Sequence, residues 1–140
     1  VKQDDFKALK FYQKACDLNF SGGCSNLGLM YEKGKGVKQD DFKALKFYQK
    51  ACDLNFSGGC SNLGLMYEKG KGVKQDDFKA LKFYQKACDL NFSGGCSQLG
   101  FMYEKGKDVR KSNTKALKYY SKACDLELAL GCKNYARLKK

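Results

Sequence analysis

The chain of 140 residues contains no histidine. Histidine is the commonest general base and metal-binding imidazole, and it activates the nucleophile in Ser-His and Cys-His catalytic pairs. Enzymes that depend on those groups are therefore excluded. The sequence also lacks an apolar stretch of the length that a membrane span needs, so we expect a soluble protein.

Acidic residues are scarce compared with basic ones, and the formal net charge is +12. Most of the excess lies in residues 109–140, as expected for a solvated end unit. Elsewhere acidic residues and lysines are interleaved, and no known nucleic-acid-binding motif is present. We therefore expect no nucleic acid partner.

Most of the sequence consists of tandem repeats. Residues 1–36 recur unchanged as residues 37–72 and, with only Gln98, Phe101 and Asp108 altered, as residues 73–108; a shorter copy fills residues 109–140. A fixed period of this length is typical of stacked-repeat proteins, whose units bury their apolar faces against one another. Near-identity fits either a recent duplication or a deliberately assembled repeat protein. We interpret residues 1–140 as one solenoid domain.

Each repeat begins with the pattern of an amphipathic helix. Asp4 or Asp5 can cap its N-terminus by accepting backbone N–H bonds. Apolar residues then recur at helical spacing from Ala8 to Cys16. The helix should end near Asn19, because asparagine tolerates a left-handed backbone conformation.

A second helix is predicted from the apolar stripe that runs from Cys24 to Tyr31. Gly28 lies inside this helix at a cost of about 1 kcal/mol relative to alanine, so we expect a neighbouring helix to approach it closely. Gly34 should end the helix. Each repeat is thus a helix–turn–helix hairpin, and no segment is a candidate strand.

The two ends of the chain differ. The fourth copy places Arg137, Lys139 and Lys140 in its second helix, and we interpret it as a C-terminal cap whose outer side is polar. These charges should also disfavour head-to-tail growth.

The first copy has no such adaptation, which suggests that the natural chain extends before Val1. Its neighbour-facing side, with Phe6, Leu9 and Phe11, should be partly exposed. We expect weak self-association of this end around a two-fold axis.

Eight cysteines form four pairs that are each eight residues apart: Cys16 and Cys24, Cys52 and Cys60, Cys88 and Cys96, and Cys124 and Cys132. In the predicted hairpin the members of a pair face each other across the turn, so a disulfide within each repeat is the simplest pairing. A zinc site is the alternative, although four-thiolate sites usually contain a more closely spaced pair. Each disulfide contributes about 2.5 kcal/mol in the chain-entropy model. Bridges on this scale indicate an oxidising compartment.

The run KALKFYQKA from Lys7 to Ala15, followed by LGLMYEKGKGV from Leu27 to Val37, resembles the Sel1-like repeat, a relative of the tetratricopeptide unit. With its cysteine pairs, the whole chain resembles the Helicobacter cysteine-rich proteins. That resemblance implies an all-α, right-handed superhelix with a disulfide in each repeat. It also implies a secreted or periplasmic bacterial protein whose signal peptide is not in this chain. Host interaction and, in some members, β-lactam binding with slow hydrolysis are implied as well.

The residues themselves give little support to β-lactam hydrolysis. Serine β-lactamases use an S-x-x-K motif together with S-D-N and K-T-G elements. Only Ser112 and Lys115 form such a motif here, and both companion elements are missing. Ser112 is also well placed to cap a helix. Ser112 and Lys115 are therefore weak catalytic candidates, and we expect no cofactor and no metal.

Lysines recur on the polar side of every first helix. Stacking would align them in rows, on a face that often binds peptides in tetratricopeptide-like proteins, so an acidic peptide or protein is a candidate partner. A solvated polar stripe is the simpler alternative, which we favour. The candidate binding residues are Lys10, Lys14, Lys46, Lys50, Lys82, Lys86, Lys118 and Lys122, flanked by Lys7, Lys43, Lys79 and Lys115. The function predicted on this basis is a protein- or peptide-binding scaffold.

Overall fold

The computed structural model describes residues 2–140, with side chains from Asp4 onward. Within these residues there are eight helices and no strand, as the sequence predicts. The first helices of the repeats are α1 (Lys2–Asp17), α3 (Asp41–Asp53), α5 (Asp77–Asp89) and α7 (Asn113–Asp125). The second helices are α2 (Ser21–Lys33), α4 (Ser57–Lys69), α6 (Ser93–Lys105) and α8 (Ala129–Lys139).

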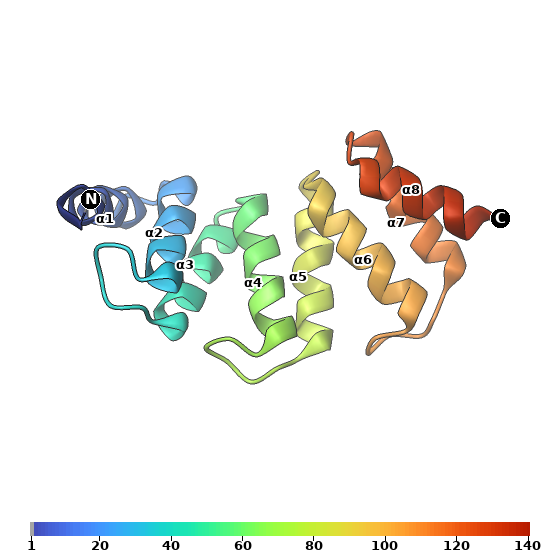
Figure 1. Ribbon diagram of the computed structural model, residues 1–140, viewed down its shortest axis with the longest axis horizontal. Helices are drawn as coiled ribbons and strands as arrows, with labels where there is room; N and C mark the ends of the chain where they lie inside the picture. Colours follow the sequence, from blue (N-terminus) through green and yellow to red (C-terminus); the bar gives the residue numbers. More distant parts are fainter. Residues whose placement is uncertain (1) are drawn as a thin grey trace.

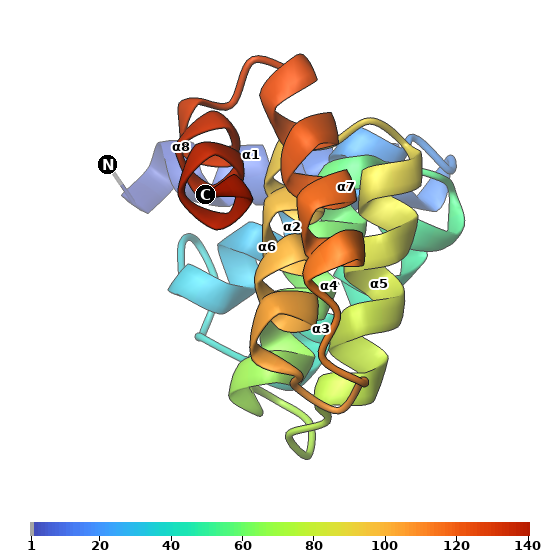
Figure 2. The same ribbon diagram turned by 90° about the vertical axis from the view of Figure 1, so that its right-hand side faces the viewer.

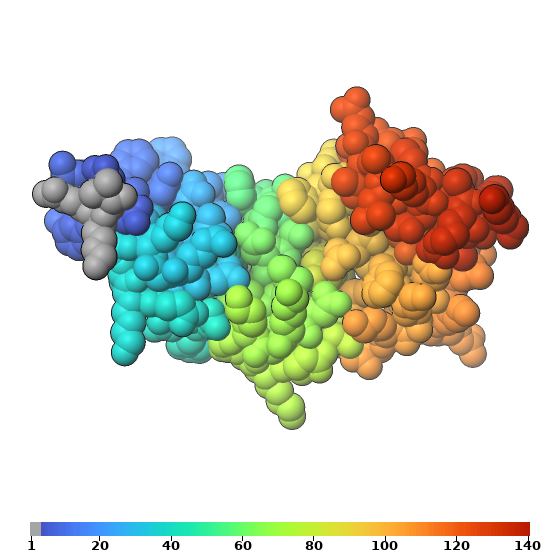
Figure 3. Space-filling model, viewed as in Figure 1, coloured from blue at the N-terminus to red at the C-terminus, as the bar shows by residue number. Residues whose placement is uncertain are grey.

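Consecutive helices pack side by side in a single elongated row, with the two ends of the chain at opposite ends of the molecule (Figure 1). Viewed along the row, successive hairpins point in different directions around the long axis (Figure 2). The space-filling view shows the same elongated body (Figure 3). None of the helices in residues 2–140 is long and apolar enough to cross a membrane.

Side-chain caps start the first helices of the later repeats. Asp40 has an extended backbone and its carboxylate accepts the N–H of Lys43 at 3.0 Å. The N–H of Asp40 donates to the carbonyl of Tyr31, which ties the loop to the preceding helix. In the first repeat the prediction that Asp4 or Asp5 caps the helix is wrong, because α1 already begins at Lys2 and both residues lie in its first turn.

The first helices end where the sequence predicts. Asn19, Asn55 and Asn91 all have φ near +65°, the left-handed conformation that asparagine tolerates. In the fourth repeat Glu127 adopts the same conformation, with φ +69°. Gly34 ends α2 with φ +69°, and its N–H donates to the carbonyl of Met30.

The core lies between each second helix and the first helix of the following repeat. Tyr48 is fully buried against Gly28, where a Cβ atom would lie only 2.8 Å from the tyrosine ring. Tyr84 and Gly64 repeat this contact, as do Tyr120 and Gly100. The close helix approach predicted from Gly28 is therefore confirmed, and the approaching group is an aromatic ring.

All four predicted disulfides are present, and every cysteine takes part in one. The Cα atoms of each pair are 4.5 or 4.6 Å apart. Each bridge joins the C-terminal end of a first helix to the first turn of the next second helix. The chain is thus covalently closed at one turn in every repeat.

Candidate functional site

A buried tyrosine, a glutamate and a cation meet at each interface between repeats. The hydroxyl of Tyr48 donates to Glu32 at 2.7 Å, and the Lys71 ammonium donates to the other oxygen of Glu32 at 2.8 Å. Tyr84, Glu68 and Lys107 form the second such group, with distances of 2.8 and 3.3 Å. In both, the lysine lies 39 residues after the glutamate, in the loop of the next repeat.

The last interface obtains its cation from a different place. Arg137 on α8 donates two hydrogen bonds to Glu104, at 2.7 and 2.8 Å, and Tyr120 donates a third at 2.8 Å. The sequence predicts an outward-facing charge at Arg137. The Arg137 side chain is indeed 53% exposed, and its guanidinium also binds Glu104, whose side chain is only 10% exposed, a pairing that the sequence did not indicate.

Hydrogen bonds and burial shift the pKa values of these glutamates and tyrosines away from neutral pH. Burial raises the pKa of Glu32, but hydrogen bonds from Lys71 and Tyr48 outweigh it and the net pKa lies below 4.5. Hydrogen bonds from Arg137 lower the pKa of Glu104 to about 2, against the opposing effect of burial. Burial, together with the neighbouring carboxylate, raises the pKa of Tyr48 far above its usual range. Near neutral pH the glutamates therefore stay ionised and the tyrosines stay protonated, which suits a structural role and not acid–base chemistry.

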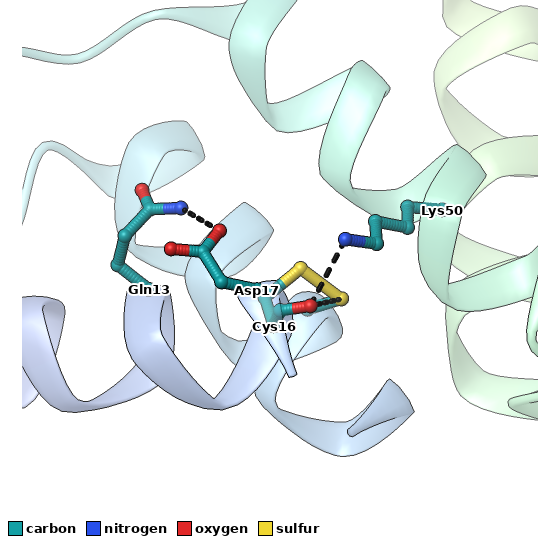
Figure 4. Close-up of a disulfide and its surroundings, with 5 residues drawn as sticks. Gln13, Cys16, Asp17 and Lys50 are labelled. Atoms are coloured by element: carbon teal, nitrogen blue, oxygen red, sulfur yellow. Dashed lines mark hydrogen bonds between the residues drawn. A yellow bond between two sulfur atoms is a disulfide. The ribbon is translucent and has the colours of Figure 1, made fainter. Parts of the chain in front are cut away.

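Two of the predicted binding lysines, Lys50 and Lys86, lie partly inside the solenoid. The Lys50 ammonium donates to the carbonyl of Cys16 at 2.9 Å, beside the disulfide and the hydrogen-bonded pair of Gln13 and Asp17 (Figure 4). Lys86 makes the same bond to the carbonyl of Cys52 at 2.8 Å. The carbonyl of Cys16 also accepts the N–H of Asn19 at 2.8 Å, so the ammonium adds a second hydrogen bond at the negative end of the helix dipole of α1.

The other lysine rows lie on aromatic rings. Lys43 and Lys79 lie 5.5 and 5.4 Å from the ring centres of Tyr31 and Tyr67, and Lys46 lies 5.6 Å from that of Phe42. A hollow of about 330 Å³ lies beside Tyr31, Lys43 and Lys46 in the first interface. Gln13 and Phe47 complete its lining. The lysine rows stay a predicted binding surface, now with aromatic rings beside the charges.

The two catalytic candidates are close in sequence but have separate contacts. Ser112 is the N-cap of α7, and its hydroxyl oxygen accepts the backbone N–H of Lys115 at 3.1 Å. The Lys115 ammonium lies 5.3 Å from the ring centre of Tyr103. Nothing in these contacts activates Ser112 as a nucleophile, since a base would have to accept its proton.

A groove that the sequence did not reveal lies on the second helices. It has a volume of about 340 Å³ and runs between α4, α6 and the start of α8. Its polar side chains are Ser61, Asn62, Ser97 and Gln98, and its apolar ones include Leu65, Leu128 and Leu130.

A sequence signal for this groove exists. Side-chain amides occupy one repeat position on all four second helices, namely Asn26, Asn62, Gln98 and Asn134.

Comparison with known proteins agrees with this architecture. The Sel1 repeat pattern matches residues 1–20, 21–56, 57–92 and 93–128. The crystal structure of a Sel1 repeat protein from Oxalobacter formigenes superimposes with a TM-score of 0.89 at 33% identity, over 98% of this chain and 56% of that one. Helicobacter pylori cysteine-rich protein B superimposes with a TM-score of 0.77 at 41% identity, over 95% and 96% of the two chains.

A shorter match connects the chain to a curated protein of Helicobacter pylori named "Putative beta-lactamase HcpC". The two are 51% identical over 37 residues, which is 26% of this chain and 13% of the longer relative. Since the Sel1 pattern covers most of the sequence and the relatives share its helical hairpins, the chain belongs to the Sel1 repeat family.

Proposed function

We propose that the chain is an extracytoplasmic scaffold that binds an extended polypeptide segment in the groove across α4, α6 and α8. The groove itself carries the proposal, because it combines amides with leucines at the junction of three repeats. The four disulfides favour an oxidising environment, so the partner is expected to be a protein or peptide outside the cytoplasm.

The chemistry of the lining suits a peptide backbone. The side-chain amides of Asn62 and Gln98 each offer both a donor and an acceptor, which are the two groups that an extended backbone presents. Leu65, Leu128 and Leu130 provide apolar contacts for every second or third side chain of such a segment.

Two disulfides lie next to the residues that line the groove. Cys60 and Cys96 immediately precede the groove residues Ser61 and Ser97, so two disulfides hold the first turns of α4 and α6 in place. A rigid lining lowers the entropy lost on binding, which favours a preformed peptide site.

Selection from a random-peptide library, with the oxidised chain as the target, tests the proposal. Selected peptides should lose most of their affinity for a double variant with Asn62→Ala and Gln98→Ala. The matched control is Lys46→Ala with Lys82→Ala, which removes two exposed cations from the first helices and should leave binding unchanged. The opposite pattern, with acidic peptides enriched, would move the binding surface to the lysine rows.

β-Lactam hydrolysis, the alternative suggested by the resemblance and by the name of HcpC, is not proposed as a second function. Ser112 caps α7 by accepting a helix N–H and the Lys115 ammonium lies 5.3 Å from the ring centre of Tyr103, so neither contact provides a base that could accept the serine proton.

A further inference from the structure

The repeat pattern is broken at the edge of the groove on the second helices. The residue before each second helix is phenylalanine in the first three repeats, Phe20, Phe56 and Phe92, and leucine in the fourth, Leu128. The backbone at this place is unchanged, since φ and ψ are −90° and 109° at Phe92 and −91° and 111° at Leu128. The side chain of Leu128 therefore leaves the backbone in the direction that the phenylalanine takes.

The second repeat shows where such a phenylalanine ring lies. One edge of the Phe56 ring is 3.1 Å from the place of a Cβ atom on Gly58, two residues later in the sequence. Another edge is 3.9 Å from the place of a Cβ atom on Gly22, in the preceding second helix. The ring thus fills the space between the first turns of α2 and α4, and Phe56 is only 37% exposed.

The equivalent space in the fourth repeat is open. Gly94 on α6 and Leu130 on α8 stand at the positions of the two glycines, and both line the groove beside Leu128. A ring placed like that of Phe56 would crowd the Cβ atom of Leu130, because the same atom on Gly58 would be only 3.1 Å away. The ring is therefore missing here, and a gap remains over Gly94. The gap lies between the third and fourth repeats, so it does not depend on an uncovered end of the solenoid.

The groove around this gap is uncharged. None of the residues that line it carries a charge, although charged residues make up 30% of the chain. A charged side chain that entered the groove would lose hydration without gaining a partner of opposite charge. The lining therefore favours an uncharged, apolar side chain in the gap.

We propose that the groove is specific for an uncharged peptide segment with one aromatic side chain, which packs over Gly94 against Leu128 and Leu130. The ring takes the place that the chain's own phenylalanine takes in the second repeat, while Asn62 and Gln98 bind the peptide backbone. This inference rests on the proposed peptide groove and adds the side chain that the peptide must carry. Leu128 and Leu130 are accordingly the residues that determine specificity.

Peptides from the library selection test this specificity. Those that bind the oxidised chain and lose affinity with Asn62→Ala and Gln98→Ala are the groove ligands. They should share a phenylalanine, tyrosine or tryptophan at one fixed position. Replacing that residue with alanine should weaken binding about tenfold or more, because the ring is buried on binding. In nuclear Overhauser spectra of the complex, the ring protons should contact the methyl groups of Leu128.

A variant that restores the repeat sequence tests the same site from the protein side. Leu128→Phe with Leu130→Gly gives the fourth repeat the phenylalanine and glycine of the second and third repeats, and circular dichroism verifies that it folds. The introduced ring should fill the gap and weaken binding of the same peptides about tenfold or more. The matched control is Phe101→Leu, which also restores the repeat sequence but lies outside the groove lining, and it should leave binding unchanged.

The outcomes separate this inference from the proposed function. Groove ligands that share no aromatic residue would overturn the aromatic specificity and leave the peptide groove in place. Equal binding by the parent chain and by a folded variant with Leu128→Phe and Leu130→Gly would do the same. If that variant does not fold, the alanine-substituted peptide decides the question. A selection that yields no peptide dependent on Asn62 and Gln98 would overturn both proposals.

Discussion

The pairing of Arg137 with Glu104 can be tested by replacing the arginine with alanine. The change removes two hydrogen bonds of 2.7 and 2.8 Å from a carboxylate whose side chain is 10% exposed. Tyr120 is then the only remaining partner in the triad. A buried carboxylate with too few partners destabilises the folded state, so the chain should unfold more easily.

The size of the effect follows from the pKa of Glu104. It falls from 4.5 to about 2, and one pKa unit corresponds to about 1.4 kcal/mol, so ionisation of Glu104 favours folding by about 3 kcal/mol. Hydrogen bonds from Arg137 are the largest cause, with Tyr120 and Lys105 adding to it. The Arg137 side chain is 53% exposed, and solvent screens the pair. We therefore expect Arg137→Ala to lower the free energy of unfolding at neutral pH by only part of the contribution from Glu104.

The pH dependence distinguishes this pair from lost packing. The folded pKa of Glu104 lies below the unfolded one, so the contribution is complete above pH 4.5 and is lost as the pH falls through about 2. Urea unfolding with intact disulfides should show a difference between Arg137→Ala and the parent chain that shrinks between neutral pH and pH 2. Lys133→Ala, an exposed cation on the same helix, should have little effect at either pH. A difference that is absent at neutral pH, or equal at both, would refute the reasoning.

Three further changes are predicted. Gly64→Ala should lower the free energy of unfolding by about 1–2 kcal/mol, because the added methyl would lie 2.9 Å from the buried ring of Tyr84 and this clash outweighs the gain in helix propensity. In the same urea titration Gly22→Ala should not be destabilising, because its nearest neighbouring atom would be 3.9 Å away. Ser112→Ala should cost about 1 kcal/mol through loss of the α7 cap, and nitrocefin turnover should remain at background in both chains. Reduction should lower the free energy of unfolding by about 2.5 kcal/mol per bridge, with a sharp fall in melting temperature. Mass mapping of the oxidised chain should recover only pairs eight residues apart.

Local features of the fold could be predicted because each depends on neighbours within one repeat. Asn19 ends a helix through its own backbone preference, and Cys16 meets Cys24 across a single turn. The reason for Gly28 was also predictable in kind, as a close helix approach. The identity of the approaching ring was not, because Tyr48 lies in the following repeat.

The features that escaped prediction depend on contacts between repeats. Lys71 reaches Glu32 over 39 residues, and Arg137 reaches Glu104 over 33, so neither pairing follows helical spacing. The helix cap predicted at Asp4 is wrong because α1 begins at Lys2, whereas the equivalent Asp40 caps α3 with its N–H bound to the carbonyl of Tyr31. The groove was missed because its lining comes from three repeats at once.

Covalent and non-covalent connections alternate along the solenoid. Disulfides join α1 to α2, α3 to α4, α5 to α6 and α7 to α8, whereas the glycine–tyrosine contacts join α2 to α3, α4 to α5 and α6 to α7. The Sel1 pattern begins units at residues 21, 57 and 93, and each of these three units is a hairpin without an internal disulfide. Three disulfides cross from one matched unit to the next, and Cys124–Cys132 joins the last matched unit to α8. In a repeat array the contacts between neighbouring units contribute directly to stability. The placement of α4 relative to α6, on which the groove depends, therefore rests on one disulfide, Cys88–Cys96, and on the non-covalent contact between Gly64 and Tyr84.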